Sequence, residues 1–378
     1  MESDRRRPGF NQVSRHASNP RCFAAGRWLA LVPFFLLLMT PPTLCAAPPA
    51  ALPIHWSQLP ALPDPLGVAG PFAGVGGGAL LVAGGANFPG KPPWQGGKKI
   101  WHDAVYVLTG LGGQWQLAGK LPRPLAYGVS VTIPAGVVCI GGSDADCHYR
   151  DVFLLVWREG KLSIESLADL PVPLANAAGA LVGSVIYVAG GSETPGEQTA
   201  VSQCFALDLK AAKPAWTVVP ACPGKARILP VAAAGSDAFY LFGGAALEPV
   251  NGKVKRVYLR DAWRYQPTIG WQRLADLPRP CVAGPTPAPS VADRFFLAGG
   301  DDGSLAGFQP PEKHPGFNRQ LLAYDADADR WTTNGEVPAA RATLPTAFWH
   351  DRYVIPSGEM RPGVRSPEVW MFRPEAKP

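Results

Sequence analysis

Two charged residues near the end of this 378-residue chain, Glu359 and Arg365, are of types that can do chemistry together. They stand six positions apart in the segment SGEMRPGVR, which glycine and proline interrupt. A carboxylate can take a proton as a general base, whereas a guanidinium hardly releases one and instead binds or stabilises negative charge. The two residues can also form a simple ion pair across a loop, and the two roles do not exclude each other.

A second group of cationic residues occurs in short turns, most of which contain proline. These residues are Arg123, Arg227, Arg279 and Arg341. A guanidinium grips a carboxylate through two parallel hydrogen bonds, so several such turns around one opening would suit an anionic, oxygen-rich ligand. For any single arginine the alternative is a structural hydrogen bond to the backbone of its turn.

Motifs for other chemistries are missing from the sequence. It contains no GxSxG, HExxH or P-loop motif, no CxxC pair and no Cys/His cluster of the metal-binding kind. The histidines are scattered, and no long Lys/Arg run follows the N-terminal segment. We therefore expect no metal, no cofactor and no nucleic-acid partner.

A repeated pattern supplies the elements that would position these residues. An apolar run that ends in Gly-Gly, or once in Ser-Gly, recurs at intervals of 49 to 58 residues. Its first positions are Gly84, Gly141, Gly190, Gly243, Gly299 and Ser357. The period and the four strand-like runs in each unit resemble the kelch repeat, which builds the blades of a β-propeller. A tryptophan on the outer strand, such as Trp271, would fill the space between neighbouring blades.

The two ends of the chain complete each other in this pattern. The last unit stops after its third strand, EVWMF, while the segment around Trp56 belongs to no other unit. The sequence therefore predicts an all-β protein whose residues 48–378 form one six-bladed kelch-type β-propeller, closed by the N-terminal strand as the fourth strand of blade six.

One face of such a propeller should carry the polar residues. The turn that leads into each blade and the turn after each glycine pair emerge on the same face, so both sets surround one mouth of the central channel. The second set comprises Asn87, Asp144, Glu193, Asp301, Asp302 and Glu359. Asp301 and Asp302 fit a turn, whereas Glu193 fits either a ligand contact or a solvated loop.

Two long blocks carry a more specific resemblance. Residues 67–103, GVAGPFAGVGGGALLVAGGANFPGKPPWQGGKKIWHD, and residues 357–365, SGEMRPGVR, resemble signature segments of the bacterial sialic acid mutarotases, or N-acetylneuraminate epimerases. In that family the Glu-Arg block precedes the GVAG block, whereas here it follows. In a closed ring this order is a circular permutation that keeps the two blocks side by side.

The resemblance implies roles for individual residues. Glu359 falls on the family's proposed general base and Arg365 on its proposed partner. His102 and Tyr127 match positions in the conserved blocks, and Asn87 matches a small or polar position.

One departure concerns the ligand carboxylate. Where the family often has Arg directly before Ala-Tyr-Gly, this chain has Leu125, with Arg123 two residues earlier. Arg123 can substitute, or the carboxylate is held differently, with Arg227, Arg279 and Arg341 as further binding candidates.

The implied activity is the interconversion of the α- and β-anomers of N-acetylneuraminate, which needs no cofactor. A base takes the proton of the anomeric hydroxyl, an acid protonates the ring oxygen, and the opened ring closes on its other face. Glu359 suits the first task, and His102, Tyr127 or water suits the second. Arg365 would bind the carboxylate or stabilise charge. The alternatives are a non-catalytic secreted kelch module that binds a glycan or a protein, and an isomerase of another sugar acid.

The first 47 residues have the pattern of an export signal. Six arginines precede or flank the apolar run WLALVPFFLLLM, and small residues follow near Ala46. We expect cleavage there and a periplasmic or secreted protein without stable membrane insertion, the alternatives being an uncleaved anchor and, less favoured by its context, lipidation at Cys45. Removal of the segment lowers the net charge from +6 to about +2. In an oxidising compartment Cys204 and Cys222 could form a disulfide.

Overall fold

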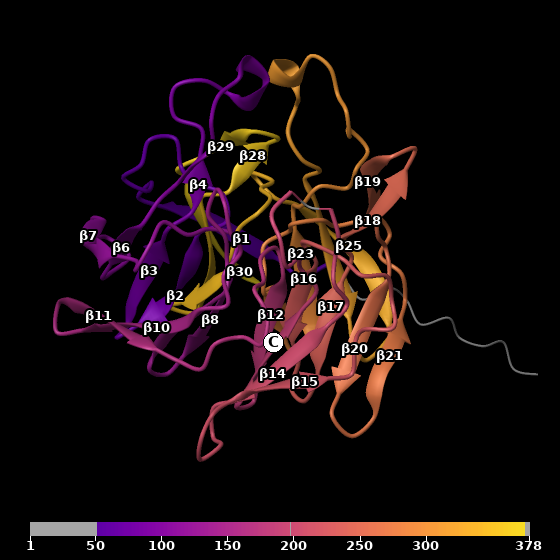
Figure 1. Ribbon diagram of the computed structural model, residues 1–378, viewed down its shortest axis with the longest axis horizontal. Coiled ribbons are helices and arrows are strands. Elements are labelled where there is room, and N and C mark those ends of the chain that lie inside the picture. Colours follow the sequence, from indigo (N-terminus) through magenta and orange to yellow (C-terminus); the bar gives the residue numbers. More distant parts are fainter. Residues whose placement is uncertain (1–50, 197, 375–378) are drawn as a thin grey trace, which may run out of the picture. The chain divides into compact units, whose positions relative to one another are not determined.

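The structure is a computed structural model that describes residues 51–196 and 198–374, so the expected export signal lies outside the described residues. Apart from two short 3-10 turns, η1 (Pro93–Gln95) and η2 (Pro311–Lys313), the regular elements are β-strands. Six four-stranded antiparallel sheets form the blades of a β-propeller (Figure 1). The predicted fold class is confirmed.

The first three blades follow the chain order from inner to outer strand. Blade one contains β2 (Phe72–Gly76), β3 (Ala79–Ala83), β6 (Ala104–Leu108) and β7 (Gln116–Lys120). Blade two contains β8 (Val129–Ile133), β9 (Gly136–Ile140), β10 (Val152–Arg158) and β11 (Lys161–Ser166). Blade three contains β12 (Ala178–Val182), β13 (Val185–Ala189), β14 (Cys204–Asp208) and β15 (Trp216–Val219).

Blades four and five follow the same order of strands, and blade six joins the two ends of the chain. Blade four contains β16 (Val231–Ala234), β17 (Phe239–Phe242), β20 (Ala262–Gln266) and β21 (Gly270–Leu274). Blade five contains β22 (Ser290–Val291), β23 (Arg294–Ala298), β24 (Gln320–Asp325) and β25 (Arg330–Glu336). Blade six contains β26 (Ala347–Trp349), β27 (Arg352–Pro356), β30 (Val369–Pro374) and β1 (Ile54–Leu59). β1 pairs with β30 along its whole length, which confirms closure by the N-terminal strand.

Three small hairpins are inserted between the second and third strands of their blades. They are β4 (Ala86–Asn87) with β5 (Ile100–Trp101), β18 (Ala245–Val250) with β19 (Lys253–Tyr258), and β28 (Glu359–Arg361) with β29 (Val364–Arg365). In Figure 1 β4, β18–β19 and β28–β29 all lie toward the upper side of the sheets. One face of the propeller therefore carries the inserted structure, as the repeat pattern predicts.

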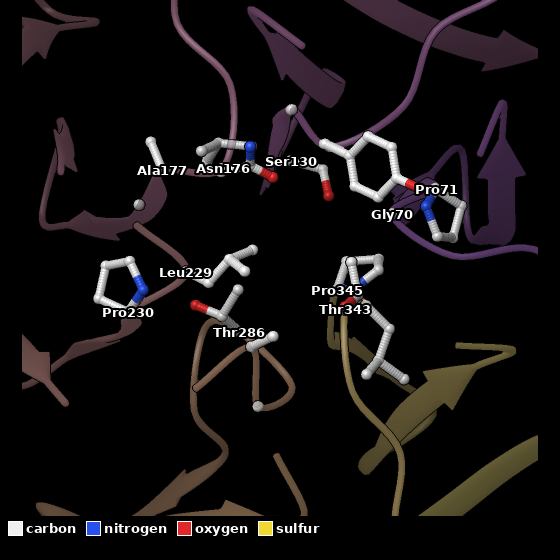
Figure 2. A pocket seen from close by; sticks show the side chains of 17 residues that line it. Gly70, Pro71, Ser130, Asn176, Ala177, Leu229, Pro230, Thr286, Thr343 and Pro345 are labelled. Atoms are coloured by element: carbon white, nitrogen blue, oxygen red, sulfur yellow. The ribbon is translucent and has the colours of Figure 1, made fainter. Parts of the chain in front are cut away.

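A closed circle of backbone hydrogen bonds surrounds the central channel. Just before each blade, one residue with a left-handed φ of 52° to 63° donates its N–H to the carbonyl of the equivalent residue one blade back, over 2.6–2.9 Å. These six residues, called the backbone ring below, are Gly70, Tyr127, Asn176, Leu229, Ala283 and Thr343. Figure 2 looks into the channel that they line. The last bond, from Gly70 to Thr343, links the two ends of the propeller.

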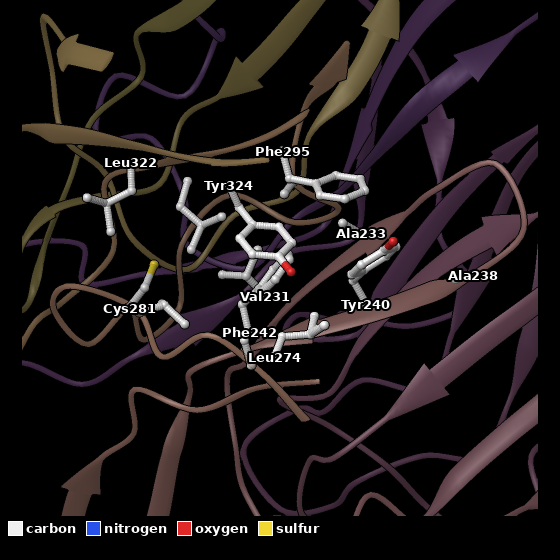
Figure 3. Close-up of a cluster of buried hydrophobic side chains, with 14 residues drawn as sticks. Val231, Ala233, Ala238, Tyr240, Phe242, Leu274, Cys281, Phe295, Leu322 and Tyr324 are labelled. Atoms are coloured by element: carbon white, nitrogen blue, oxygen red, sulfur yellow. The ribbon is translucent and has the colours of Figure 1, made fainter. Parts of the chain in front are cut away.

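Apolar layers between neighbouring blades hold the propeller together. Between blades four and five, Tyr240, Phe242, Phe295 and Tyr324 pack in one buried cluster (Figure 3). The outer-strand tryptophans behave as predicted and also bond across the blade boundary, Trp271 donating to the Pro220 carbonyl over 2.6 Å. Trp115, Trp216 and Trp331 make the same kind of bond to the preceding blade.

The described cysteines are all free, including the pair considered for a disulfide. Cys204 and Cys222 lie in the same buried apolar cluster, between blades three and four. Burial raises the pKa of both thiols above the ordinary value. Within residues 51–196 and 198–374, no helix has the length and apolar character needed to cross a membrane.

Candidate active site

The candidate site is a cavity of ≈ 390 Å³ at the hairpin end of the central channel. Four members of the backbone ring line it: Tyr127, Asn176, Leu229 and Thr343. The charged or titratable side chains of its wall come from loops and hairpins of several blades. They are Lys99, Asp144, His148, Arg256, Glu359 and Arg365. The cavity therefore combines a floor of fixed backbone with a strongly polar wall.

The hairpin β28–β29 places Glu359 directly opposite Arg365 in its register. Arg365 Nη1 lies 2.9 Å from Glu359 Oε1, and the two side chains are only 4% and 19% exposed. Arg365 also donates from Nε to the Ala86 carbonyl over 3.2 Å, and its guanidinium lies over the Phe88 ring, 4.7 Å from the centroid. The pair considered from the sequence therefore forms, and it sits in the cavity wall.

The two blocks that are far apart in the sequence meet at this hairpin. Val68 donates its N–H to the Ser357 hydroxyl over 2.7 Å, and Gly358 donates to the Val68 carbonyl over 2.9 Å. At Gly67, which has a φ of +66°, an added Cβ would lie 2.2 Å from the Ser366 carbonyl oxygen. Such contact requires glycine at position 67. The predicted neighbourhood of residues 67–103 and 357–365 is confirmed.

Lys99 is a cavity residue that sequence reasoning did not select. Its ammonium lies 5.0 Å from the Tyr127 ring centroid, 5.4 Å from that of Trp101 and 5.9 Å from that of Phe88. The available signal was the Gly-Gly-Lys-Lys segment in the block that carries the resemblance. That segment does not reveal which of its two lysines faces the cavity.

The wall from blade two supplies Asp144 and His148. Burial acts to raise the pKa of the Asp144 carboxyl, but hydrogen bonds from Tyr149 and from backbone N–H groups outweigh it and lower that pKa below its usual value. His148 Nδ1 lies 2.9 Å from the Ser192 carbonyl oxygen, which can only accept, so Nδ1 carries the proton. Sequence reasoning missed His148 because nothing in its neighbourhood marks it.

His102 and Asn87 lie beside the cavity rather than in its lining. His102 Nε2 is 2.9 Å from Asn87 Oδ1, and Asn87 Nδ2 donates to Asp64 Oδ2 and to the Gly67 carbonyl, each over 2.9 Å. This network fixes the segment that precedes blade one, and Asn87 is only 1% exposed. Glu193 is also outside the lining. The ligand-directed roles of these residues stay predictions.

The four arginines of the turns bond to residues at equivalent positions of their blades and do not line the cavity. Each contacts the residue at the start of a third strand in the blade that its turn enters. The pairs are Arg123–Asp151, Arg227–Asp261, Arg279–Gln320 through its carbonyl, and Arg341–Glu368. None of the four arginines lines the cavity. Arg227, Arg279 and Arg341 also donate to a carbonyl of their own turn, as the structural alternative expects. Arg123 instead pairs with Asp151 and lies over the Tyr149 ring. Binding of a ligand by these residues stays a prediction.

The comparisons with known proteins decide the family. The N-acetylneuraminate epimerase family model matches residues 50–164 and 167–309. The chain belongs to this family. The N-acetylneuraminate epimerase of Brucella suis is 43% identical over 129 residues, which cover 30% of this chain and 32% of the relative. That of Yersinia enterocolitica is 45% identical over 111 residues, covering 26% and 27%. The chain thus spans about a third of the length of the curated relatives it matches.

A solved structure supports the fold of this epimerase-family chain. It is titled "Structure of YjhT", has a TM-score of 0.62 and 17% identity, and covers 83% of this chain and 97% of its own. The residues matched by the family model include the block at 67–103 but end before Glu359 and Arg365. The chain's own geometry therefore carries the argument for those two residues.

Proposed function

We propose that the protein is a mutarotase that interconverts the α- and β-anomers of N-acetylneuraminate. The observation that carries this proposal is the Glu359–Arg365 pair in the wall of the polar cavity. Its hairpin adjoins residues 67–103, which lie within the match to the family model. The curated relatives named N-acetylneuraminate epimerase support the same substrate.

Glu359 acts as the base in the proposed reaction. It takes the proton of the anomeric hydroxyl as the ring C–O bond breaks and a carbonyl forms, while an acid gives its proton to the ring oxygen. Closure on the other face of the carbonyl reverses both transfers. Arg365 holds the carboxylate of Glu359 in one orientation, since the two side chains face each other across the hairpin at 2.9 Å.

Tyr127 and His148 are cavity side chains that can supply the acid. Tyr127 was expected from the sequence, and His148 takes the place of His102, which lies outside the lining. With Nδ1–H directed at the Ser192 carbonyl, Nε2 is the His148 atom that gains or loses a proton. The volume of ≈ 390 Å³ suits a single sugar.

The test is the rate of anomer exchange, followed by NMR on freshly released α-anomer. The protein should accelerate equilibration, and Glu359→Gln should slow it by about 10²–10⁴-fold, the usual contribution of general acid–base catalysis. Glu165→Gln is the matched control, because Glu165 is an exposed glutamate on the outer strand β11 and lies outside the cavity lining. No acceleration over buffer by the wild-type protein would refute the proposal, and binding without acceleration would favour a non-catalytic glycan-binding module.

We further propose that the protein is exported and that residues 1–47 are removed. The basic start, the short apolar run and the small residues near Ala46 support this. Mass spectrometry of the protein recovered from its native host should give a mature N-terminus near Ala47. A retained N-terminal segment in the membrane fraction would overturn the proposal.

A further inference from the structure

Lys99 is the cavity cation whose charge no carboxylate of the described residues neutralises. Its ammonium contacts three aromatic rings, those of Phe88, Trp101 and Tyr127, and makes no ion pair within residues 51–196 and 198–374. Aromatic faces attract a cation through their quadrupole but leave its full charge in place. Lys99 is also half-buried, so its ammonium is partly removed from water. An anionic ligand group would provide the missing countercharge.

Arg365 is poorly suited to that task in this structure. Its side chain is only 4% exposed, and it faces Glu359, the Ala86 carbonyl and the Phe88 ring. Arg256, the remaining cavity arginine, lies on the separate hairpin β18–β19 and already has an interaction partner. Among these three cations, Lys99 therefore has both a place in the lining and a charge that awaits an anion.

We propose that Lys99 binds the carboxylate of the substrate and thereby selects sugar acids over neutral sugars. The inference deepens the proposed mutarotase function and rests on it. In a sugar acid whose anomeric carbon bears the carboxylate, the anion-binding group must stand close to the base that deprotonates the anomeric hydroxyl. Phe88 provides this proximity, because its ring contacts both Lys99 and the Arg365 that holds Glu359.

The contacts of Arg365 and Lys99 assign different roles to the two residues. Arg365 orients the base, and Lys99 holds the anionic end of the ligand. The two cationic side chains that contact the Phe88 ring therefore have different partners. The three rings restrict where the ammonium can lie, which reduces the entropy lost when it pairs with a ligand. A charged hydrogen bond in such a site strengthens binding by about 10- to 100-fold.

The experiment compares Lys99→Met with Lys98→Met. Methionine keeps an unbranched apolar side chain against the aromatic rings and removes only the charge. Lys98 is the adjacent exposed lysine, which lies outside the cavity lining. Calorimetry measures the Kd of each folded variant for N-acetylneuraminate and for its neutral C1 amide, and a thermal melt checks that folding is retained.

We expect Lys99→Met to weaken binding of N-acetylneuraminate by about 10- to 100-fold, to leave binding of the amide within about threefold, and to reduce the salt dependence of Kd. KM in the anomer-exchange assay should rise by a similar factor, while Lys98→Met should match the wild type. Equal losses for the acid and the amide, or a carboxylate-dependent loss in Arg256→Gln but not in Lys99→Met, would overturn the proposal.

The Kd measurements test the role of Lys99 independently of the proposed mutarotase reaction. If the wild-type protein shows no anomer exchange but Lys99→Met still loses affinity for the acid alone, the assignment of Lys99 stands and the proposed reaction fails. If exchange is fast and Lys99→Met leaves both Kd and KM unchanged, the reaction stands and the assignment of Lys99 fails.

Discussion

Two buried arginine–carboxylate pairs in this propeller differ in how completely they are bonded. In blade four, Arg227 donates to both oxygens of Asp261, over 2.8 and 2.6 Å, and to the carbonyls of Lys225 and Gly243. In blade six, Arg365 makes one aligned hydrogen bond, to the Ala86 carbonyl, and Nη1 approaches Glu359 without one.

The two pairs also differ in their exposure and in their position relative to the cavity. Arg227 is 1% exposed and lies outside the cavity lining, which favours a structural role for its hydrogen bonds. Arg365 and Glu359 both line the cavity, and Glu359 remains 19% exposed. A buried ion pair whose hydrogen bonds are complete stabilises the structure, whereas an incompletely bonded pair in a cavity wall can take part in chemistry. Mutations can separate these two roles.

The largest effect is expected from Arg227→Met. It leaves the Asp261 carboxylate without its partner in a largely buried position, which typically costs about 3–5 kcal/mol of the free energy of unfolding. Denaturant titration measures this loss. The rate of anomer exchange per folded molecule should remain that of the wild type, because Arg227 does not line the cavity. A rate loss in the folded fraction would contradict the structural assignment.

The same pair has a pH signature. Burial would raise the pKa of the Asp261 carboxyl, but the hydrogen bonds and charge of Arg227 outweigh it and hold that pKa below its usual value. A lowered pKa in the folded state adds stability above the unfolded value of about 3.9, and this stability disappears as pH falls through the folded pKa. The stability gap between the wild type and Asp261→Asn should therefore be constant near neutral pH and narrow below about pH 4. A gap that persists unchanged into strong acid would contradict this.

Arg365→Met should give the reverse result. The rate of anomer exchange should fall by about 10²-fold, the usual cost when a positioned catalytic group is misplaced, because Arg365 orients the Glu359 carboxylate. The free energy of unfolding should fall less than in Arg227→Met, because Glu359 keeps access to the cavity and to water. Paired NMR exchange and denaturant measurements check both parts. Equal stability losses in the two variants would remove the distinction between the pairs.

A smaller effect is expected where blade six meets blade one. Ser357→Ala removes a buried hydroxyl that accepts from Val68 N–H over 2.7 Å and lies 2.8 Å from the Ser366 carbonyl oxygen. An unsatisfied buried donor costs about 1–3 kcal/mol. Thermal unfolding measures the loss, with Ser184→Ala on an exposed turn as the control. An effect no larger than that of the control would show that the hydroxyl does not strengthen the junction.

The smallest effect concerns the boundary between blades three and four. Trp271→Phe keeps an aromatic ring but removes the indole N–H that donates to the Pro220 carbonyl over 2.6 Å. One such bond contributes about 0.5–1.5 kcal/mol, so the stability should fall by about that amount without any change in the exchange rate. A change in exchange rate would indicate that the outer strands influence the cavity.

The fold was largely readable from the sequence because its signals repeat. The Gly-Gly pairs, the outer-strand tryptophans and the unpaired strand around Trp56 specify blades, spacing and closure, and each copy supports the others. The meeting of Val68 with Ser357 also followed, since a closed ring must bring its two ends together.

The site was less readable because its contacts do not repeat. The turn arginines formed a regular series in the sequence, yet Arg227 and its counterparts bond within their blades. Lys99 and His148 come from loops whose conformation depends on aromatic and backbone contacts in space. A repeat pattern in the sequence reveals residues that occur in every blade, whereas the cavity is lined by loop residues that occur in single blades.

The backbone ring has one further consequence, for the evolution of the gene. Its six members are related by rotation, and the six hydrogen bonds are equivalent wherever the polypeptide starts. A gene rearranged to begin in any blade would rebuild the same circle, provided that the new opening falls outside it. The link from Gly70 to Thr343 is as short, at 2.7 Å, as those within the continuous chain. Rotational equivalence at the axis thus allows the chain to start in different blades, so that the hairpin β28–β29 keeps the same spatial neighbours whichever blade comes first.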